Sequence, residues 1–130
     1  MEPQNLRFTS DHEWIGQDGD AFRVGITDYA QEQLGDITYV ELPKPPRTVA
    51  KHDVVATVES VKAAGDVYSP VAGEVVAVNH ELVDHPERVN QDPYGAGWFF
   101  KIIPADPNAL NELMDWTQYS AYVKSLETHP

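Results

Sequence analysis

The stretch VVATVESVKAAGDVYSPVAGEVVAV, from Val54 to Val78, determines the fold class expected for this 130-residue chain. β-Branched residues dominate positions 54–59, which is typical of a strand with at least one covered face. A second run, residues 64–68, follows after only four residues, and a gap of this length is typical of a β-hairpin connection. The pattern therefore predicts a hairpin with its tip at residues 60–63, which presents Lys62 to solvent.

Lys62 stands alone as a primary amine in this part of the chain. It is the only lysine between Lys51 and Lys101, and the acidic residues Glu59 and Asp66 flank it. A deprotonated lysine amine is an acyl acceptor, and a compact turn presents it to a modifying enzyme in a fixed geometry. Most surface lysines are simply solvated charges. The residues therefore allow a covalent attachment site and an ordinary charged surface residue alike.

Composition limits the partners of the chain. Nine basic and twenty-one acidic residues give a formal net charge of -12, which repels nucleic-acid phosphates and anionic lipids and favours basic protein surfaces. We expect no nucleic-acid and no membrane partner. The absence of cysteine excludes disulfides and thiolate metal sites. No signal-like or membrane-spanning apolar stretch is present, so a soluble intracellular protein is expected.

The remaining sequence predicts short strands with helices at two places. Many short strands at regular spacing indicate an all-β barrel or sandwich, and the length suits a single domain. Thr27 is expected to cap a short helix that Gly35 ends. A C-terminal helical segment of about residues 106–126 is expected to begin at Asp106-Pro107, with Thr117 as the cap of its last helix. Further strands are expected at residues 21–26, 37–42, 74–78 and 98–103.

Other reactive residues do not form a recognisable site. His80 and His85 have roughly the spacing of metal ligands, but they lie in an expected loop or single helical turn without an evident fourth ligand, so no metal is expected. The triplet Asp11-His12-Glu13 could serve acid–base chemistry, but no nucleophile or phosphate-binding glycine loop accompanies it. A stand-alone enzyme is therefore not expected. The tryptophans and tyrosines are expected in the core and in cleft walls rather than as docking anchors.

Several blocks of the sequence resemble the H protein of the glycine cleavage system. The central block surrounds Lys62 and consists of ESVKA (59–63), DVYSP (66–70) and GEVV (73–76). The flanking blocks occur in the family's order and are HEW (12–14), VGITDYAQ (24–31), LGD (34–36), VELP (40–43), VNQDPYG (89–95) and GW (97–98). The chain is identified by these blocks as a member of that family over nearly its whole length.

The resemblance implies a mainly β fold, the barrel-sandwich hybrid of lipoyl and biotinyl domains, with a short internal helix and C-terminal helices. One lipoyl-carrier domain would span residues 1–130. Lipoic acid would be joined to Lys62 in amide linkage, and the chain would be a carrier without catalytic groups of its own. By analogy, Glu13, Asp66 and Ser10 would contact the loaded arm, although Glu13 and Asp66 are equally well explained as surface carboxylates. Glu59 is expected to help a lipoyl-attaching enzyme recognise the hairpin.

The resemblance also implies three enzymes that the arm visits in turn. These are a pyridoxal-phosphate glycine decarboxylase (P protein), a tetrahydrofolate-dependent aminomethyltransferase (T protein) and a dihydrolipoyl dehydrogenase (L protein). A lipoyl or octanoyl transferase, or a lipoate ligase, would attach the arm. The expected compartment is the cytoplasm of a bacterium, or the mitochondrial matrix if the source is eukaryotic.

Some alternatives and departures accompany the resemblance. Val61 and Ala63 stand where biotin carriers have methionines, and the flanking blocks argue against a lipoyl domain of a 2-oxo acid dehydrogenase. An H-like carrier used in lipoyl relay or sulfur oxidation remains an alternative, as does an unmodified binding or regulatory module. The chain has Pro46-Arg47 and His52 where the family usually has glycine, and Gly65 where a small polar residue is common.

Overall fold

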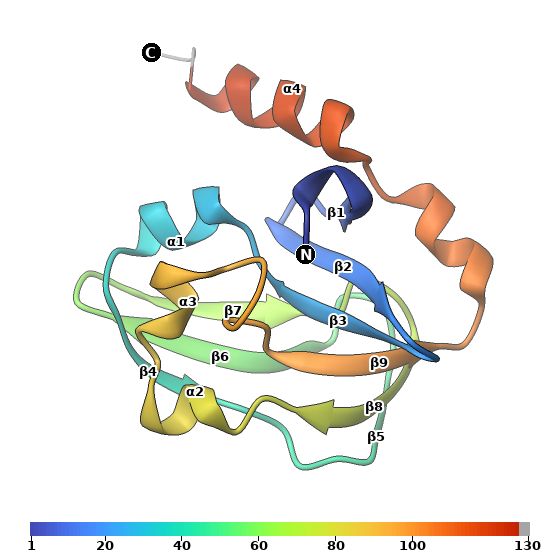
Figure 1. The fold of residues 1–130 in the computed structure, drawn as a ribbon, viewed down its shortest axis with the longest axis horizontal. Coiled ribbons are helices and arrows are strands. Elements are labelled where there is room, and N and C mark those ends of the chain that lie inside the picture. The colour runs from blue at the N-terminus through green and yellow to red at the C-terminus, as the bar shows by residue number, and fades with distance from the viewer. Residues whose placement is uncertain (128–130) are drawn as a thin grey trace.

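The fold consists of two antiparallel sheets, as the computed structural model shows for residues 1–127 (Figure 1). One sheet has six strands in the order β1-β2-β3-β9-β8-β5, and the other has three in the order β4-β6-β7. The strands are β1 (Arg7–Phe8), β2 (Glu13–Asp18), β3 (Ala21–Ile26), β4 (Ile37–Glu41), β5 (Arg47–Val49), β6 (Val54–Ser60), β7 (Ala64–Tyr68), β8 (Gly73–Val78) and β9 (Phe100–Pro104). The helical segments are η1 (Pro3–Asn5), α1 (Asp28–Leu34), α2 (Glu81–Asp84), α3 (Arg88–Gln91), η2 (Pro107–Glu112) and α4 (Trp116–Glu127). The expected mainly β class is therefore confirmed.

The two sheets share one apolar core. Val58 and Val67 from the small sheet and Val24, Val75 and Ile102 from the large sheet belong to the same cluster, and each is at most 2% exposed. Burial of a side chain of this size contributes about 1.5 to 3 kcal/mol. The β-branched run at residues 54–59 is therefore a strand on this core, but Val55 and Ala56 are both buried and Val54 is exposed, because the pairing of β6 with β7 is irregular between Val54 and Ala56.

The central hairpin has the predicted position. Strand β6 pairs with β7 so that Glu59 lies opposite Ala64. The tip has no glycine or asparagine, but Ser60 takes the place of such a turn residue. Its Oγ accepts hydrogen bonds from the backbone N–H groups of Lys62 (3.2 Å) and Ala63 (3.0 Å), and its own N–H donates to the Ala63 carbonyl (2.8 Å). A serine hydroxyl can fix a turn in this way, so the tip has a defined shape.

Helix α1 also has the predicted limits, and it lies near the tip of the β6–β7 hairpin (Figure 1). The Thr27 Oγ1 accepts a hydrogen bond from the Ala30 N–H at 3.2 Å, which makes Thr27 the expected N-cap. Gly35 ends the helix with a φ of 79°, a left-handed conformation that glycine adopts readily. The short turn from α1 to β4 therefore lies beside the tip of the hairpin.

The C-terminal segment differs in part from expectation. Asp106 caps as predicted, by accepting from the Asn108 N–H, but it begins the 3₁₀ helix η2 rather than an α-helix. The prediction of Thr117 as cap of the last helix was wrong. Asp115 has this role, because its Oδ1 accepts from the Gln118 N–H at 2.8 Å while the Gln118 Oε1 accepts from the Asp115 N–H at 2.9 Å. This reciprocal pair is a capping box, which satisfies two free backbone donors at once.

Two strand predictions also need correction. The strands expected from the sequence do not include residues 47–49, which form β5 and pair with β8. Val49 is buried there and supplies the apolar side chain that holds this short strand on the core. Strand β9 begins at Phe100, two residues later than predicted, because the Trp98 carbonyl instead accepts from the Asn79 side chain.

His52 stands in a backbone conformation that normally favours glycine. Its φ is 73°, whereas the neighbouring Lys51 has no positive φ, and among residues 1–127 its side chain has one acidic neighbour, the exposed Asp11, at 3.9 Å. The left-handed region costs a residue with a Cβ about 1 to 2 kcal/mol, partly offset by the greater unfolded-state entropy of glycine. His52→Gly is therefore expected to raise the free energy of unfolding by about 0.5 to 1 kcal/mol in urea denaturation.

The matched control for this prediction is Lys51→Gly. Glycine at this neighbouring exposed position relieves no strain and should lower stability by about 0.5 to 1 kcal/mol. Equal losses in His52→Gly and Lys51→Gly would contradict the strain at His52.

Candidate functional site

Lys62 projects from the hairpin tip while the backbone beside it is anchored. The Val61 N–H donates to the Asp36 carbonyl at 3.1 Å, which ties the tip to the turn after α1. The Lys62 stem passes close to Gly35, since a Cβ built on that glycine would lie 3.1 Å from the Lys62 Cε. Among residues 1–127 no carboxylate lies within ion-pair distance of the Lys62 amine, so Glu59 and Asp66 leave it accessible.

Asn90 on α3 holds the turn that anchors the tip. Its Oδ1 accepts from the Ile37 N–H at 2.9 Å, and its Nδ2 donates to the Gly35 carbonyl and to the Gln31 Oε1, both at 2.9 Å. The turn therefore has hydrogen bonds from Asn90 on one side and from the Lys62-bearing tip on the other. Sequence reasoning missed this role, because Asn90 lies more than fifty residues from each of its partners along the chain.

A cleft of about 350 Å³ opens between α1 and the hairpin. We call it the arm cleft. It combines apolar walls, from residues such as Ile26 and Val67, with carboxylates at one side. Its lining residues are Asp11, His12, Glu13, Ile26, Tyr29, Ala30, Gln33, Leu34, Val58, Gly65, Asp66 and Val67. The structure therefore brings together Glu13 and Asp66, two of the residues predicted to contact an arm.

Glu13 is a buried carboxylate, not a surface one. It is 1% exposed, its Oε1 accepts from the Thr9 hydroxyl at 2.8 Å, and its Oε2 accepts from the Tyr68 N–H at 3.3 Å. Burial raises the pKa of Glu13 to about 7, against the opposing effect of these two hydrogen bonds. The alternative reading of Glu13 as a solubilising surface residue was therefore wrong, whereas Asp66 is exposed at the edge of the cleft.

A polar chain connects the arm cleft to α4. The Tyr119 hydroxyl lies 2.7 Å from the Thr27 Oγ1 and 2.8 Å from the His12 Nδ1. Burial lowers the pKa of His12, although the nearby Asp11 charge opposes this shift, so a neutral imidazole lines the cleft next to Glu13. Sequence reasoning missed Tyr119, because only the tertiary fold brings residue 119 beside residues 12 and 27.

Ser10 and Glu59 lie outside the arm cleft. Ser10 is exposed and lines a neighbouring cavity, and its backbone carbonyl accepts from the Tyr122 hydroxyl at 3.4 Å. Glu59 is exposed on β6, close to the tip but not among the cleft residues. Of the four predicted accessory residues, the structure thus places two in one cavity and two elsewhere.

The tryptophans have structural environments. Trp14 is fully buried and its Nε1 donates to the Pro93 carbonyl at 2.9 Å, which confirms its expected place in the core. Trp98 is half-buried, with the Arg23 guanidinium 5.2 Å and the Lys101 amine 5.4 Å from its ring centroid. These cation–π contacts and packing against the second core cluster hold Trp98 in place.

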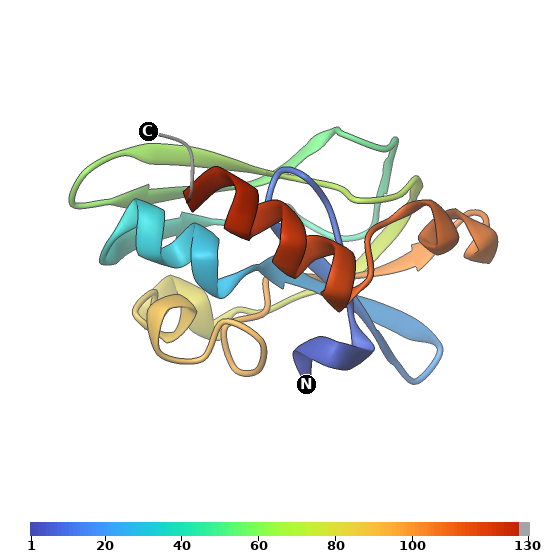
Figure 2. The ribbon, with the colours of Figure 1, turned by 90° about the horizontal axis from the view of Figure 1, so that it is seen from above.

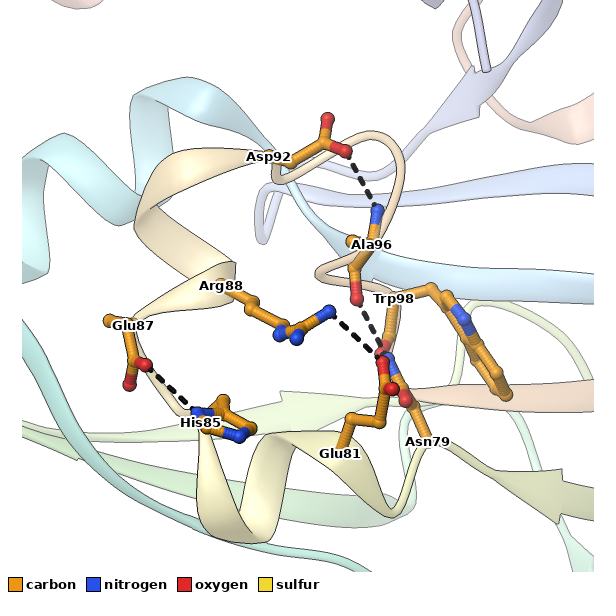
Figure 3. Close-up of polar contacts among 8 residues, drawn as sticks. All are labelled: Asn79, Glu81, His85, Glu87, Arg88, Asp92, Ala96 and Trp98. Carbon is orange, nitrogen blue, oxygen red and sulfur yellow. Dashed lines mark hydrogen bonds and ion pairs between the residues drawn. The ribbon is translucent and has the colours of Figure 1, made fainter.

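Of the two histidines considered as metal ligands, His85 has another partner (Figure 3). The His85 Nδ1 lies 3.2 Å from the Glu87 Oε1, and Glu81 pairs with Arg88 at 3.1 Å. Within the part of the chain that the structure describes, no group of three or more histidine and acidic residues is arranged to hold a metal ion. The same residues contain no helix that is long and apolar enough to cross a membrane.

Comparisons with known proteins agree with this geometry. The model of the glycine cleavage H-protein family matches residues 6–126. Proteins named glycine cleavage system H protein are 53% identical in Parvibaculum lavamentivorans, over 95% of this chain and 98% of theirs, and 55% identical in Paramagnetospirillum magneticum, over 93% and 97%.

The fold matches a solved structure of the same kind. The crystal structure of a glycine cleavage system H protein from Mycobacterium marinum superposes with a TM-score of 0.85, at 38% identity over 95% of this chain and 99% of that chain. This likeness confirms the expected barrel-sandwich class. The chain therefore belongs to the glycine cleavage H-protein family, which supplies the non-catalytic carrier subunit of the glycine cleavage system.

Proposed function

We propose that this chain carries a lipoyl group in amide linkage on Lys62 and moves the aminomethyl group of glycine between enzymes. The observation that carries this proposal is the pairing of an accessible lysine on an anchored tip with an adjacent cleft that contains Glu13 and Asp66. The cleft's apolar walls suit the hydrocarbon part of such an arm, and its carboxylates suit an amine cation at the arm's end.

When bound, the lipoyl group supplies the dithiolane that accepts the aminomethyl group at the P protein, delivers it at the T protein and is reoxidised at the L protein. The residues of this chain have simpler tasks. The hairpin presents the arm, and acylation removes the charge of Lys62, so the modified side chain can enter an apolar cleft at lower cost. Tethering raises the local concentration of the carried group at each enzyme in turn.

The arm cleft would protect the loaded arm between encounters. Glu13 is held by Thr9 and Tyr68, so its carboxylate is already oriented before an amine arrives. Asp66 would add a second, more exposed negative charge. Exclusion of water by the apolar walls would slow hydrolysis of the carried group. Ser10 remains a weaker candidate, since it lines the neighbouring cavity.

The enzyme that attaches the arm would recognise the shape of the hairpin. A lipoyl or octanoyl transferase or a lipoate ligase must receive the Lys62 amine in its active site, and exposed Glu59 lies on the strand leading to the tip. We place these reactions in the bacterial cytoplasm, because the relatives named above are bacterial.

Reconstitution tests the proposed function. The lipoylated chain is combined with the P, T and L proteins, glycine, tetrahydrofolate and a two-electron acceptor for the L protein, and ammonia release is followed. We expect release to depend on the chain and to increase with its concentration. Lipoylation at Lys62 without glycine-dependent release would instead favour the alternative carrier in lipoyl relay or sulfur oxidation, and an unmodified chain would favour the binding-module alternative.

The hydrogen bonds of Asn90 predict that its substitution affects both stability and lipoylation. Asn90→Ala removes two hydrogen bonds to the turn beside the Lys62-bearing tip and one to Gln31 on α1, and it leaves the Ile37 N–H and the Gly35 carbonyl without these partners. We expect a loss of about 2 to 3 kcal/mol in the free energy of unfolding and a several-fold lower kcat/KM for lipoylation. Urea denaturation and a ligase assay measure the two.

The control is Gln91→Ala, an exposed neighbour on the same helix, which should change neither quantity. In Asn90→Asp the acceptor for the Ile37 N–H is retained and both donors are lost, so its effect should be intermediate. Normal stability and normal lipoylation of Asn90→Ala would refute the bracing role of Asn90.

A further inference from the structure

A second groove, of about 400 Å³, lies between α1 and α4, whose neighbouring positions are visible in Figure 2. Its floor is aromatic and consists of Tyr29, Tyr94, Trp116 and Tyr119. We call it the aromatic groove. The proposed carrier function does not use it, and it shares only Tyr29 with the lining of the arm cleft.

The rim of the aromatic groove is predominantly acidic. Asp28 and Glu32 on α1 and Glu127 on α4 contribute three carboxylates, while Lys124 contributes one cation. Two of these charges act on the floor: burial raises the pKa of Tyr94, the hydrogen bond from the Asp28 N–H opposes this shift, and the charges of Asp28 and Glu32 raise the pKa further. The groove therefore has an electrostatic preference for a positive group.

Hydrogen bonds and ring contacts hold the floor in place. The Tyr94 hydroxyl accepts from the Asp28 N–H at 3.1 Å, and the Tyr119 hydroxyl lies 2.7 Å from the Thr27 Oγ1. The Tyr119 ring stacks on the Phe8 ring at a centroid distance of 4.6 Å, and the Trp116 ring lies 5.5 Å from the Phe8 ring. A floor fixed in this way loses little conformational entropy when a ligand binds.

We propose that the aromatic groove is the docking site for an arginine side chain on a basic segment of an enzyme that works on the loaded arm. A guanidinium group stacks on aromatic rings and forms directed hydrogen bonds to carboxylates, so it complements both the floor and the rim. This inference rests on the proposed function, because that function supplies the enzymes. The formal net charge of -12 on the whole chain also favours a positively charged partner.

The position of the groove fits a partner that takes the arm from its cleft. Tyr29 lines both the aromatic groove and the arm cleft, and its ring lies 4.7 Å from the His12 imidazole, which also lines the cleft. A segment docked in the aromatic groove would therefore be separated from the protected end of the arm by the Tyr29 side chain. Docking and arm release would occur at adjacent places on the surface.

The test measures KM and kcat of the P, T and L proteins for the lipoylated chain at low ionic strength. We expect Glu32→Gln/Glu127→Gln to raise KM for at least one enzyme by about threefold to tenfold, with kcat unchanged, because rim charges act mainly on association. Lys124→Gln removes the competing cation and should lower KM for the same enzyme. The expected effects should decrease with added salt.

The matched control is Asp20→Asn/Glu74→Gln, which removes the same total charge from exposed positions outside the groove. A rise in KM equal to that of the control, or no rise with any of the three enzymes, would overturn the docking proposal. A parent chain that is never loaded from glycine would instead refute the proposed function, so the two failures are distinguishable.

Discussion

Lys62→Arg is expected to fold normally, to carry no lipoyl group and to give no ammonia release above background in the reconstituted system. Arginine retains a positive charge and a long side chain at the tip, so the surface of the hairpin changes little. The guanidinium is a poor acyl acceptor, because it stays protonated at any accessible pH. Loss of modification would therefore follow from the missing amine.

The hairpin geometry makes this substitution conservative for stability. Lys62 is exposed and takes part in the turn through its backbone N–H, which arginine keeps. Lys44→Arg, in the exposed connector, serves as the control and should be lipoylated at the parental rate. Lipoylation of Lys62→Arg at full stoichiometry would show that the arm is attached elsewhere.

Glu13→Gln is expected to shorten the lifetime of the loaded arm by about tenfold above pH 7. A hydrogen bond between a carboxylate and a charged amine is worth about 1.5 to 3 kcal/mol, and glutamine cannot supply the ionic part of it. Glutamine keeps the size of the side chain and an acceptor for the Thr9 hydroxyl. The lifetime is measured by mass spectrometry after loading, as the carried group is lost with time.

The pH dependence follows from the direction of the pKa shift. The ionised form of Glu13 is the one that binds a cation, and its pKa is raised to about 7. Protection in the parent should therefore decline as pH falls through about 7. Glu13→Gln should lack this decline. Asp66→Asn, at the exposed edge of the cleft, should have a smaller effect.

Stability provides the control for Glu13→Gln. In the folded state the pKa rises from 4.5 to about 7, so the fold favours the protonated form, and the stability that Glu13 contributes is lost as pH rises from 4.5 to 7. Above pH 7 the variant avoids the cost of a buried charge but loses the acceptor for the Tyr68 N–H, so it should be at least as stable as the parent. A shorter lifetime in a protein that is no less stable could not result from unfolding, whereas equal lifetimes at all pH values would remove Glu13 from the site.

The sequence predicted those elements whose formation depends on residues that are close together along the chain. The hairpin follows from the β-branched residues 54–59 and the four-residue gap after them, and α1 follows from Thr27 and Gly35 at its two ends. Val49 shows the limit of this reasoning. A strand of three residues has too little pattern of its own, and β5 exists because β8 and the core are beside it.

The candidate site was predictable to the same extent. Lys62 is marked by the residues around it, and Glu13 and Asp66 were found through resemblance. The burial of the Glu13 side chain, by contrast, results from packing between strands. No local sequence pattern distinguishes a carboxylate that is 1% exposed from one in solvent. The contacts of Asn90 and Tyr119 join segments more than fifty residues apart, so only the folded chain reveals them.

The most direct measurement is the intact mass of the purified chain after lipoate ligase treatment, and again after addition of glycine, pyridoxal phosphate and the P protein, followed by peptide mapping. We expect a gain of one lipoyl group and then of one aminomethyl group, both on the peptide that contains Lys62. A chain that gains no lipoyl group, or gains it on another residue, would contradict the assignment of Lys62 as the carrier site.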